Sequence, residues 1–457
     1  MTTTPENTAE PADSPYHVGH YAPVPDETEG FDLKVTGTLP RELNGRYLRN
    51  GPNPRPGDTT GHLFTANGML HGVRLRDGRA EWYRNRWVRT GKLAGEPFRR
   101  EDGTVDLTVV SANTHVIAHA DKLLALVETG LPYEVTGELE TVGPCDFGGR
   151  LTTAMTAHPK ADPVTGELLF FGYGPVPPYC TYHRLSASGE LVESREIAVP
   201  GATMMHDFAI TENYVVWLDL PVLFDLARLH GGMPMRWHDA YGARLGLMRR
   251  DGVGEVRWFD IDPCYVFHVG NAYEDAAGRV VLDAVRFSRA TFDAMWQAFG
   301  GHVDNPAVTS WVLGEDQSGC LYRWRLDPAT GTVSEEAIDD RGVEVPSLND
   351  ELTGRPNRYL YTLAKNSIMK YDTISGTSRA YGTGEGSAPG EAAFVPAEGG
   401  SGEEDAGWLL SIVSYGPGRR SELLVLDARD LTLVATVELP RRVPSGFHGS
   451  WIPDQRG

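Results

Sequence analysis

Strand–turn–strand units recur along most of this 457-residue chain. In residues 321–338, apolar and polar residues alternate, the turn sequence Asp-Pro-Ala-Thr-Gly follows, and a second alternating run begins. Alternation with period two predicts half-buried strands, and Pro and Gly between them predict a hairpin turn. Similar units occupy residues 182–199, 246–261, 368–382 and 422–439. A further apolar run precedes each unit, at 167–174, 213–221, 279–287, 358–364 and 407–413.

Several strands in every 50–70 residues predict an all-β fold, a β-propeller whose blades are small antiparallel sheets around an axis. At about 60 residues per blade, the chain accommodates about seven blades. The 52 Gly and 31 Pro residues sum to 83 of 457 positions. This is about 18%, against a usual background of about 12%, and it indicates many tight turns. A set of separate β-sandwiches is the alternative that the repeat leaves open.

We expect one propeller domain over residues 19–457, preceded by a flexible tail over residues 1–18, which are acidic and lack an apolar run. Residues 221–237 depart from the strand pattern. Their apolar residues at helical spacing are Val222, Leu223, Leu226 and Leu229. This spacing predicts a helical or loop cap over one face of the propeller, either a lid or an apolar rim. An ordinary packed loop helix explains the same spacing.

The net charge of −20, from 42 basic and 62 acidic residues, excludes a basic nucleic-acid-binding surface. Only six residues are Lys, so we expect at most a weak, apolar contact of residues 221–237 with a membrane surface. No run of 18 apolar residues occurs. The four Cys form no Cys-X-X-Cys pair, which is typical of reduced thiols in a cytoplasmic protein. The sequence indicates no obligate protein partner.

Four of the 14 His residues stand among apolar or small residues at the ends of strand-like runs. They are His158, His206, His268 and His448. Their spacings of 48, 62 and 180 residues are close to multiples of the blade length. Equivalent inner positions in different blades converge on the propeller axis, where four imidazoles would form a metal site. The alternative for each is a buried structural histidine.

Four neutral imidazoles suit Fe(II), Cu, Ni or Zn rather than Mg or Ca. A ligating His usually donates its second ring N–H to a carboxylate or a carbonyl. Three Glu in apolar surroundings fit this role, although each also fits an exposed strand or turn: Glu128, Glu344 and Glu391. A zinc or copper hydrolase would lack a general base if all three Glu are bound to His. A propeller that binds a metal or a ligand without chemistry is a further alternative.

From about Gly19 to Pro453 the chain resembles the carotenoid cleavage oxygenases, a family that includes stilbene-cleaving enzymes. The resemblance rests on segments such as LPRELNGRYLRNGPNPRPG (39–57), MMHDFAITENYVVWLDLP (204–221) and FHVGNAYED (267–275). Further matching segments are 61–78, 82–92, 113–135, 151–173, 421–453 and the surroundings of Glu344 and Glu391. One departure is Asn67, where an Asp is expected before Gly-Met.

The resemblance implies a seven-bladed propeller with one Fe(II) on its axis, held by the four histidines, and O2 as co-substrate. It implies that Glu128, Glu344 and Glu391 hold His206, His268 and His448, respectively. His158 would then lack a Glu partner, and the side chain of Thr114 would crowd one open coordination position.

The implied activity is that of a non-haem iron dioxygenase that splits a C=C bond of a carotenoid or apocarotenoid into two carbonyl products. Stilbenoids or phenylpropenoids such as resveratrol and isoeugenol are the alternative substrates. Stilbene-cleaving relatives carry a Lys immediately before the first of the three Glu, and here that residue is Val127. Because Val cannot hydrogen-bond a phenol, this favours a carotenoid. Candidates for an apolar substrate tunnel are Tyr47, Trp87, Val127, Tyr133, Phe208, Phe267 and Trp451.

Overall fold

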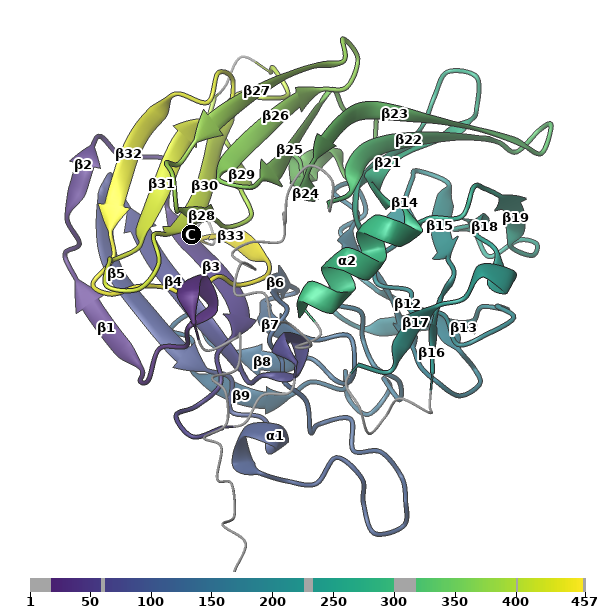
Figure 1. The fold of residues 1–457 in the computed structure, drawn as a ribbon, viewed down its shortest axis with the longest axis horizontal. Coiled ribbons are helices and arrows are strands. Elements are labelled where there is room, and N and C mark those ends of the chain that lie inside the picture. The colour runs from purple at the N-terminus through teal and green to yellow at the C-terminus, as the bar shows by residue number, and fades with distance from the viewer. Residues whose placement is uncertain (1–17, 59–61, 226–232, 300–317, 400–401, 455–457) are drawn as a thin grey trace, which may run out of the picture.

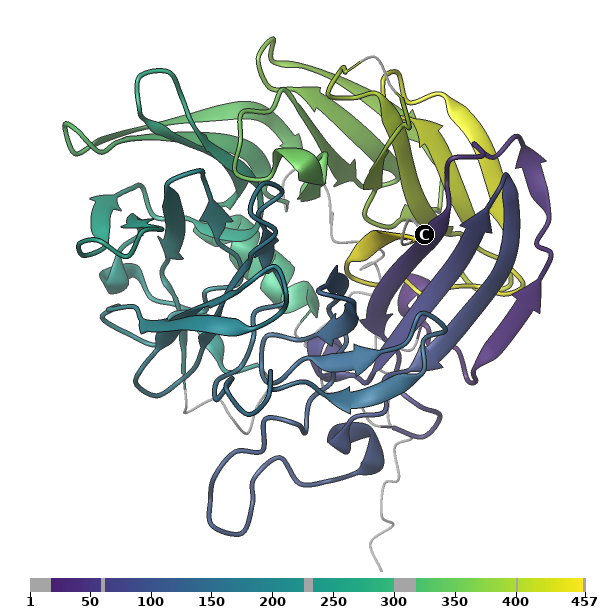
Figure 2. The ribbon, with the colours of Figure 1, turned by 180° about the vertical axis from the view of Figure 1, so that it is seen from behind.

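Seven antiparallel sheets surround a central axis as the blades of a propeller (Figure 1, Figure 2). The computed structural model describes residues 18–58, 62–225, 233–299, 318–399 and 402–454. The prediction of an all-β, seven-bladed propeller is confirmed. The predicted tail of residues 1–18 lies outside the described residues, except for its last position.

The second to sixth blades each contain four strands that follow one another from the axis outward. The second blade contains β6 (His115–His119), β7 (Lys122–Leu126), β8 (Tyr133–Val135) and β9 (Thr141–Pro144). The third contains β10 (Lys160–Ala161), β11 (Leu168–Tyr173), β12 (Cys180–Leu185) and β13 (Leu191–Glu196). The fourth contains β14 (Ala209–Ile210), β15 (Tyr214–Asp219), β18 (Arg244–Arg249) and β19 (Arg257–Asp260).

The fifth blade contains β20 (Tyr265–Glu274), β21 (Val280–Phe287), β22 (Cys320–Asp327) and β23 (Thr332–Gly342). The sixth contains β24 (Glu344–Ser347), β25 (Tyr359–Ala364), β26 (Ser367–Asp372) and β27 (Thr377–Gly382). All five strand–turn–strand units predicted from the sequence are hairpins of neighbouring strands within these blades and the seventh.

Both ends of the chain contribute to the first and seventh blades, which closes the ring. The first blade has the order β1 (Thr28–Phe31), β5 (Arg79–Trp87), β4 (Gly68–Arg76), β3 (Gly45–Pro52) and β33 (Gly449–Pro453). The seventh has the order β2 (Val35–Gly37), β32 (Leu433–Glu438), β31 (Glu422–Asp427), β30 (Gly407–Ser414) and β28 (Ala388–Pro389), and β29 (Ala393–Pro396) also pairs with β30. The last described strand therefore lies next to one of the first.

The turn between β22 and β23 shows why the sequence forms a hairpin there. The Asp327 carboxylate accepts hydrogen bonds from the backbone N–H groups of Ala329 (2.8 Å) and Thr330 (3.1 Å). Gly331 then adopts φ +78°, a left-handed conformation that a residue without Cβ reaches at little cost. The Asp-Pro-Ala-Thr-Gly sequence thus fixes both the turn and the register of the two strands.

Helix α2 (Arg289–Phe299) connects β21 to the segment before β22 and crosses one face of the propeller (Figure 1). Its buried side chains Phe292 and Trp296 stack on Phe267 of β20, with ring centroids 5.9 and 6.3 Å apart. A short helix, α1 (Gly91–Ala94), follows β5. The remaining described helices are single 3-10 turns: η2 (Gly19–Tyr21), η3 (Leu63–Thr65), η5 (Asp239–Tyr241) and η6 (Asp350–Leu352).

The prediction of a helix over residues 221–237 is wrong for the residues that the structure describes. Val222–Phe224 form strand β16 and Met235–Trp237 form strand β17, which pair as an antiparallel hairpin. Residues 226–232, which include Leu226 and Leu229, lie outside the described residues. The apolar side chains at 222 and 223 are compatible with either element, because so short an apolar run does not distinguish a helical period from a strand period. Phe224, Met233, Pro234 and Met235 of this segment line one of the two cavities described below.

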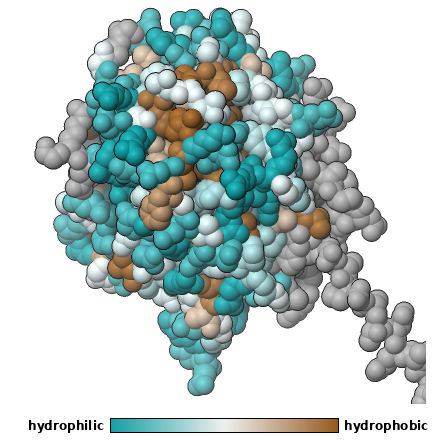
Figure 3. All heavy atoms as spheres, turned by 90° about the vertical axis from the view of Figure 1, so that its left-hand side faces the viewer, coloured by the Kyte–Doolittle hydropathy of each residue, from teal (hydrophilic) through white to brown (hydrophobic). Residues whose placement is uncertain are grey.

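The side of the molecule that carries β1, β2, β5 and β32 is largely hydrophilic, with one limited gathering of apolar side chains (Figure 3). No helix among the described residues is long and apolar enough to cross a membrane.

Ring closure gives a first testable prediction. Arg74 on β4 is 4% exposed at its side chain and binds both carboxylate oxygens of Asp454, at 2.5 and 2.6 Å, just after β33. Asp454→Asn removes the bidentate partner of this guanidinium and leaves it the more distant carboxylate of Glu81, at 3.6 Å, so we expect the protein to lose about 2 kcal/mol of stability.

The measurement is the apparent midpoint of thermal unfolding of the variant against the parent. Asp32→Asn is the matched control, because the Asp32–Arg79 pair is 81% and 73% exposed and contributes little. An equal shift in both variants would contradict a role of the Arg74–Asp454 pair in closing the ring.

Candidate metal centre

The four singled-out histidines lie at the inner strands of four different blades. His268 lies within β20, and His158, His206 and His448 lie within three residues before β10, β14 and β33. Each of these strands is the edge of its sheet that faces the axis (Figure 1). Positions more than 40 residues apart in the chain therefore meet at one point.

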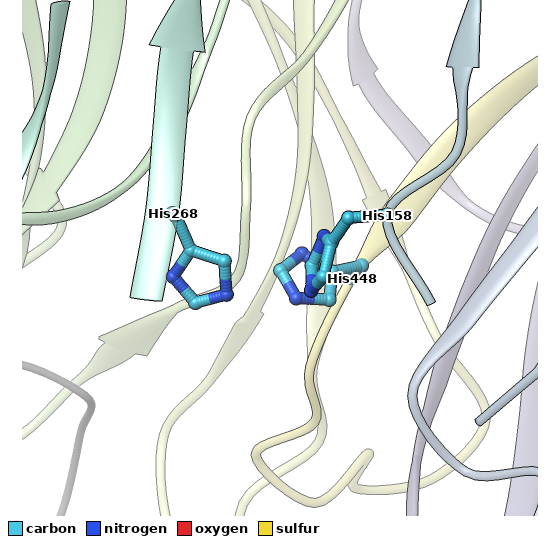
Figure 4. Close-up of side chains that lie close together, drawn as sticks. All are labelled: His158, His268 and His448. Carbon is cyan, nitrogen blue, oxygen red and sulfur yellow. The ribbon is translucent and has the colours of Figure 1, made fainter. Parts of the chain in front are cut away.

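The imidazoles converge closely enough to share one ion. The ligand nitrogens of His158, His268 and His448 all lie within 4.8 Å of one another, and Figure 4 shows the three rings directed at a common centre. His206 joins them, since its Nε2 lies 3.0 Å from Nε2 of His158. All four residues are buried, with exposed fractions of 3–7%.

These distances fit a transition-metal ion. Two nitrogens that bind one ion at about 2.1 Å and at right angles to each other lie about 3.0 Å apart, which matches the His158–His206 distance. Imidazole nitrogen suits Fe, Cu, Ni or Zn and does not suit Ca or Mg. The buried cluster therefore fits a non-haem metal ion.

Three carboxylates hold three of the histidines by their second ring nitrogen. Nδ1 of His206 lies 2.6 Å from Oε2 of Glu128. Nδ1 of His268 lies 2.7 Å from Oε2 of Glu344, and Nδ1 of His448 lies 3.2 Å from Oε2 of Glu391. A proton on Nδ1 that is shared with a carboxylate leaves the lone pair of Nε2 for a metal. The structure thus brings each of the three Glu to the His that the sequence analysis assigned to it.

The four histidines and the three carboxylates come from seven different blades. Four blades carry one histidine each, and the other three carry one carboxylate each. Glu128 follows β7 of the second blade, Glu344 begins β24 of the sixth, and Glu391 lies between β28 and β29 of the seventh. Every blade therefore contributes one group to the centre.

Burial dominates the electrostatics of the cluster. It lowers the pKa of His158 and His268 well below the usual value, and the neighbouring imidazoles lower it further. Burial also raises the pKa of Glu344 to about 8. For His206, burial lowers the pKa, but the carboxylates of Glu128, Asp207 and Glu344 together more than compensate, so the pKa is raised. The environment thus favours neutral imidazoles at His158 and His268.

His115 was not identified from the sequence, and it braces two of the ligand segments. Burial lowers its pKa to about 4, so the ring is neutral. Nδ1 donates to the carbonyl of Ala157 (3.0 Å), next to His158, and Nε2 accepts from the hydroxyl of Ser450 (3.0 Å), two residues after His448. His158, which has no carboxylate partner, is thus held through its neighbour in the chain.

Asp207 was also missed, and it connects three blades. Its Oδ1 lies 2.8 Å from Nζ of Lys160, two residues after His158, and its Oδ2 accepts from the backbone N–H of Val269 at 2.8 Å. The carboxylate is 2% exposed. The only signal for it in the sequence is its position directly after His206 in an apolar stretch.

Two cavities reach the histidines. An axial cavity of about 400 Å³, with a wall of mixed polar and apolar residues, touches His158, His268 and His448, and the wall includes His115, Lys160, Asp207 and Asp350. An apolar cavity of about 370 Å³ touches His206 and His448. Its apolar wall consists of Phe64, Phe98, Val109, Val110, Val127, Phe224, Met233, Pro234, Met235 and Phe447. Both volumes lie within the range of about 300–1,000 Å³ that is typical of small-molecule sites.

Thr114 lies immediately before β6 and lines the apolar cavity beside His206 and His448. Its backbone carbonyl accepts the N–H of His448 (3.1 Å), and its hydroxyl donates to Oδ1 of Asn113 (3.0 Å). The side chain is therefore fixed at the inner end of the cavity.

Of the seven side chains named as tunnel candidates, Val127 lines the apolar cavity and Trp451 lines the axial one instead. The other five are buried within the blades or between them: Tyr47, Trp87, Tyr133, Phe208 and Phe267. Phe208, for example, stacks on Trp217 of its own blade. Apolar context marks a side chain as buried, but it does not distinguish a cavity wall from the packing between sheets.

A propeller with four imidazoles on its axis, three of them bound to carboxylates, is the construction of a non-haem metal enzyme. The chain matches the retinal pigment epithelial membrane protein family over residues 21–453. It is 40% identical to a carotenoid cleavage oxygenase of Mycobacterium tuberculosis, over 98% of this chain and 99% of that protein. It is 35% identical to a carotenoid 9,10(9′,10′)-cleavage dioxygenase of Crocus sativus, over 96% of this chain and 89% of that protein.

Among solved structures, a lignostilbene dioxygenase of Pseudomonas brassicacearum superimposes with a TM-score of 0.83 at 30% identity, over 97% of this chain and 99% of that one. The chain therefore belongs to the carotenoid cleavage oxygenase family, which also bears the name of the retinal pigment epithelial membrane protein. It is an oxygenase that cleaves carbon–carbon double bonds.

The cluster predicts that metal loading depends on each imidazole. His268→Ala is expected to reduce the Fe(II) or Co(II) content after anaerobic reconstitution from about one ion per chain to background, because it removes a ligand and leaves Glu344 buried without its partner. The measurement is metal analysis of the desalted protein.

His119→Ala is the control, since Nε2 of His119 bonds the carbonyl of Ser186, which is not part of the cluster. A His268→Ala protein that retains a full complement of metal would contradict the site.

The carboxylates predict a graded effect. Glu344→Gln keeps a hydrogen-bond acceptor for Nδ1 of His268 but removes the negative charge, so we expect metal affinity to fall by about 10–100-fold with the fold intact. The affinity is measured by competition with a chelator. Glu190→Gln, at an exposed turn, is the matched control and should leave the affinity unchanged.

Proposed function

We propose that this chain is an Fe(II)-dependent dioxygenase whose substrate is a carotenoid or an apocarotenoid. The observation that carries the proposal is the apolar cavity that ends at His206 and His448, with Val127 in its wall. A conjugated polyene presents mostly carbon surface, and such a wall removes that surface from water.

In this proposal, His158, His206, His268 and His448 hold the iron, and Glu128, Glu344 and Glu391 fix the orientation of three of them. Bound iron supplies the activation of O2 for addition across the double bond. The protein itself places the scissile bond, excludes water with Val109, Val110 and Phe447, and provides no general acid or base. The Thr114 side chain limits the space beside the metal.

Val127 supports a polyene over a stilbene. It stands immediately before Glu128, is 5% exposed, and offers only carbon to a ligand at the inner end of the cavity. Among the described residues that line this cavity there is no Tyr, and its one Lys, Lys92, lies toward the mouth and not at the inner end. The two relatives with 40% and 35% identity are both described by carotenoid cleavage.

Cleavage of stilbenoid or phenylpropenoid double bonds is the second candidate function. It is favoured by the similarity, at 30% identity, to a lignostilbene dioxygenase. The propeller of residues 19–457 is the unit to which we assign either activity. We propose a cytoplasmic enzyme that meets its hydrophobic substrate at most by weak contact with a membrane surface.

Turnover of defined substrates tests the choice. The iron-loaded protein, in air, is expected to cleave β-carotene or a hydroxylated apocarotenal with a kcat/KM at least about tenfold above that for resveratrol or isoeugenol. The products are carbonyl compounds, which mass spectrometry identifies. Faster cleavage of resveratrol than of both polyenes would overturn the substrate assignment.

Val127→Lys tests the same assignment by introducing the phenol-binding group that this chain lacks at position 127. The new ammonium group at the inner end of the cavity is expected to raise the kcat/KM ratio of resveratrol over polyene by about tenfold, the value of one hydrogen bond to a charged group. Val127→Met, which adds length without a donor, is the control and should not raise the ratio.

A further inference from the structure

The apolar cavity contains one cationic side chain among its described lining residues, Lys92 of helix α1. The inner end of the cavity is formed by Thr114, Glu128 and the histidines, whereas Lys92 lies with Glu96 and the 45% exposed Phe98 toward the surface. Lys92 is partly buried and its Nζ forms an exposed hydrogen bond, so the ammonium group stands where the apolar wall of Val, Phe and Met carbon meets water and favours oxygen partners. The question is therefore which oxygen atoms bind the ammonium group of Lys92.

The backbone holds Lys92 in place. Thr90 caps the helix by accepting the N–H of Leu93 (3.2 Å), and Gly95 ends it in a left-handed conformation with φ +83°. The hydroxyl of Tyr133 accepts the N–H of Gly91 (3.3 Å) and donates to the carbonyl of Thr108 (2.6 Å). These bonds hold the backbone of Lys92 against the second blade, which contains Tyr133.

The ammonium group has donors to spare. Nζ donates one hydrogen bond to the carbonyl of Thr65, which also lines the cavity, and an ammonium carries three N–H donors. Among the described residues no carboxylate lies within ion-pair distance of it, although the charge of Asp58 acts on the group. Burial lowers the pKa of Lys92 more than the charge of Asp58 raises it, which is consistent with a partly dehydrated group.

The charged residues around the cavity determine which kind of ligand oxygen Lys92 can bind. Glu96 near the mouth and Glu128 near the metal line the same space and repel a carboxylate ligand. A hydroxyl or carbonyl oxygen is neutral, accepts a hydrogen bond from Nζ and has no such conflict.

We propose that Lys92 is a specificity-determining residue that binds a hydroxyl or carbonyl oxygen at the end of the polyene nearest the cavity mouth. The preferred substrate is then an oxygenated polyene, such as a ring-hydroxylated apocarotenal, rather than a pure hydrocarbon. This inference rests on the proposed function. The bond to Lys92 sets how deeply the polyene enters, and so which double bond stands beside the metal.

The test compares two substrates that differ by one oxygen: an apocarotenal with a 3-hydroxyl on its ring and the same aldehyde without it. With iron-loaded wild type, we expect KM to be at least about tenfold lower for the hydroxylated compound, with kcat changed by less than about twofold. Lys92→Met, which keeps the length of the side chain, is expected to abolish this difference. Lys92→Arg keeps a donor and should restore most of it.

Lys122→Met is the matched control, because Lys122 pairs with Glu134 outside the cavity. Binding of both aldehydes to the Co(II)-loaded proteins, followed by fluorescence quenching, gives a readout independent of turnover. The dissociation constant should show the same tenfold difference in wild type and none in Lys92→Met.

Equal KM values of wild type for both aldehydes would overturn the inference, and so would a Lys92→Met protein that loses the same factor on both. The second result would assign Lys92 to the structural bond with Thr65. If Lys92→Met fails to fold, the wild-type and Lys92→Arg comparisons still decide. The failure of the proposed function is a different result, namely no cleavage of either polyene by wild type.

Discussion

The hydrogen bond between a buried imidazole and a buried carboxylate is the interaction on which the centre depends. Four imidazoles that face one another are otherwise free to rotate or to hydrogen-bond with one another, since Nε2 of His158 and Nε2 of His206 lie only 3.0 Å apart. A carboxylate on Nδ1 fixes the tautomer and aims Nε2 at the axis. The burial of these carboxylates has a cost, since burial raises the pKa of Glu344 to about 8, and a divalent cation held by the histidines would offset that cost. Metal binding and local order are therefore coupled.

The propeller supplies this arrangement because its inner strands end on one axis. Bonds between neighbouring blades then keep the ligand segments in register. Asp207 ties the blades of His158, His206 and His268, while His115 ties the segments of His158 and His448. The braces act within two residues of a ligand, so a displacement of one blade would move a ligand directly. Precision at the metal is thus a property of the closed ring, which the first and seventh blades complete.

Much of this could be predicted from the sequence. Period-two alternation and turn residues marked the hairpins such as Cys320–Asp327 with Thr332–Gly342, and the apolar surroundings of the four His marked the axis. The features that the sequence did not predict have physical causes. Phe208 and Val127 are both buried apolar residues, yet only Val127 faces the cavity, and the difference depends on how two sheets meet. His115 stands in a polar stretch, and its role depends on Ser450, 335 residues away.

Among the described residues, no carboxylate binds the ring of His158, and the number of blades explains why. With one group per blade, four histidines leave three blades for acids, so one histidine must be held in another way. Thr156 accepts the backbone N–H of His158 (3.1 Å) and donates to the carbonyl of His206 (3.4 Å), and His115 binds the intervening Ala157. These are neutral bonds. A fourth acid in their place would bury one more carboxylate at the centre, at a further desolvation cost. The backbone anchor at His158 therefore limits the charge of the centre as well as completing its geometry.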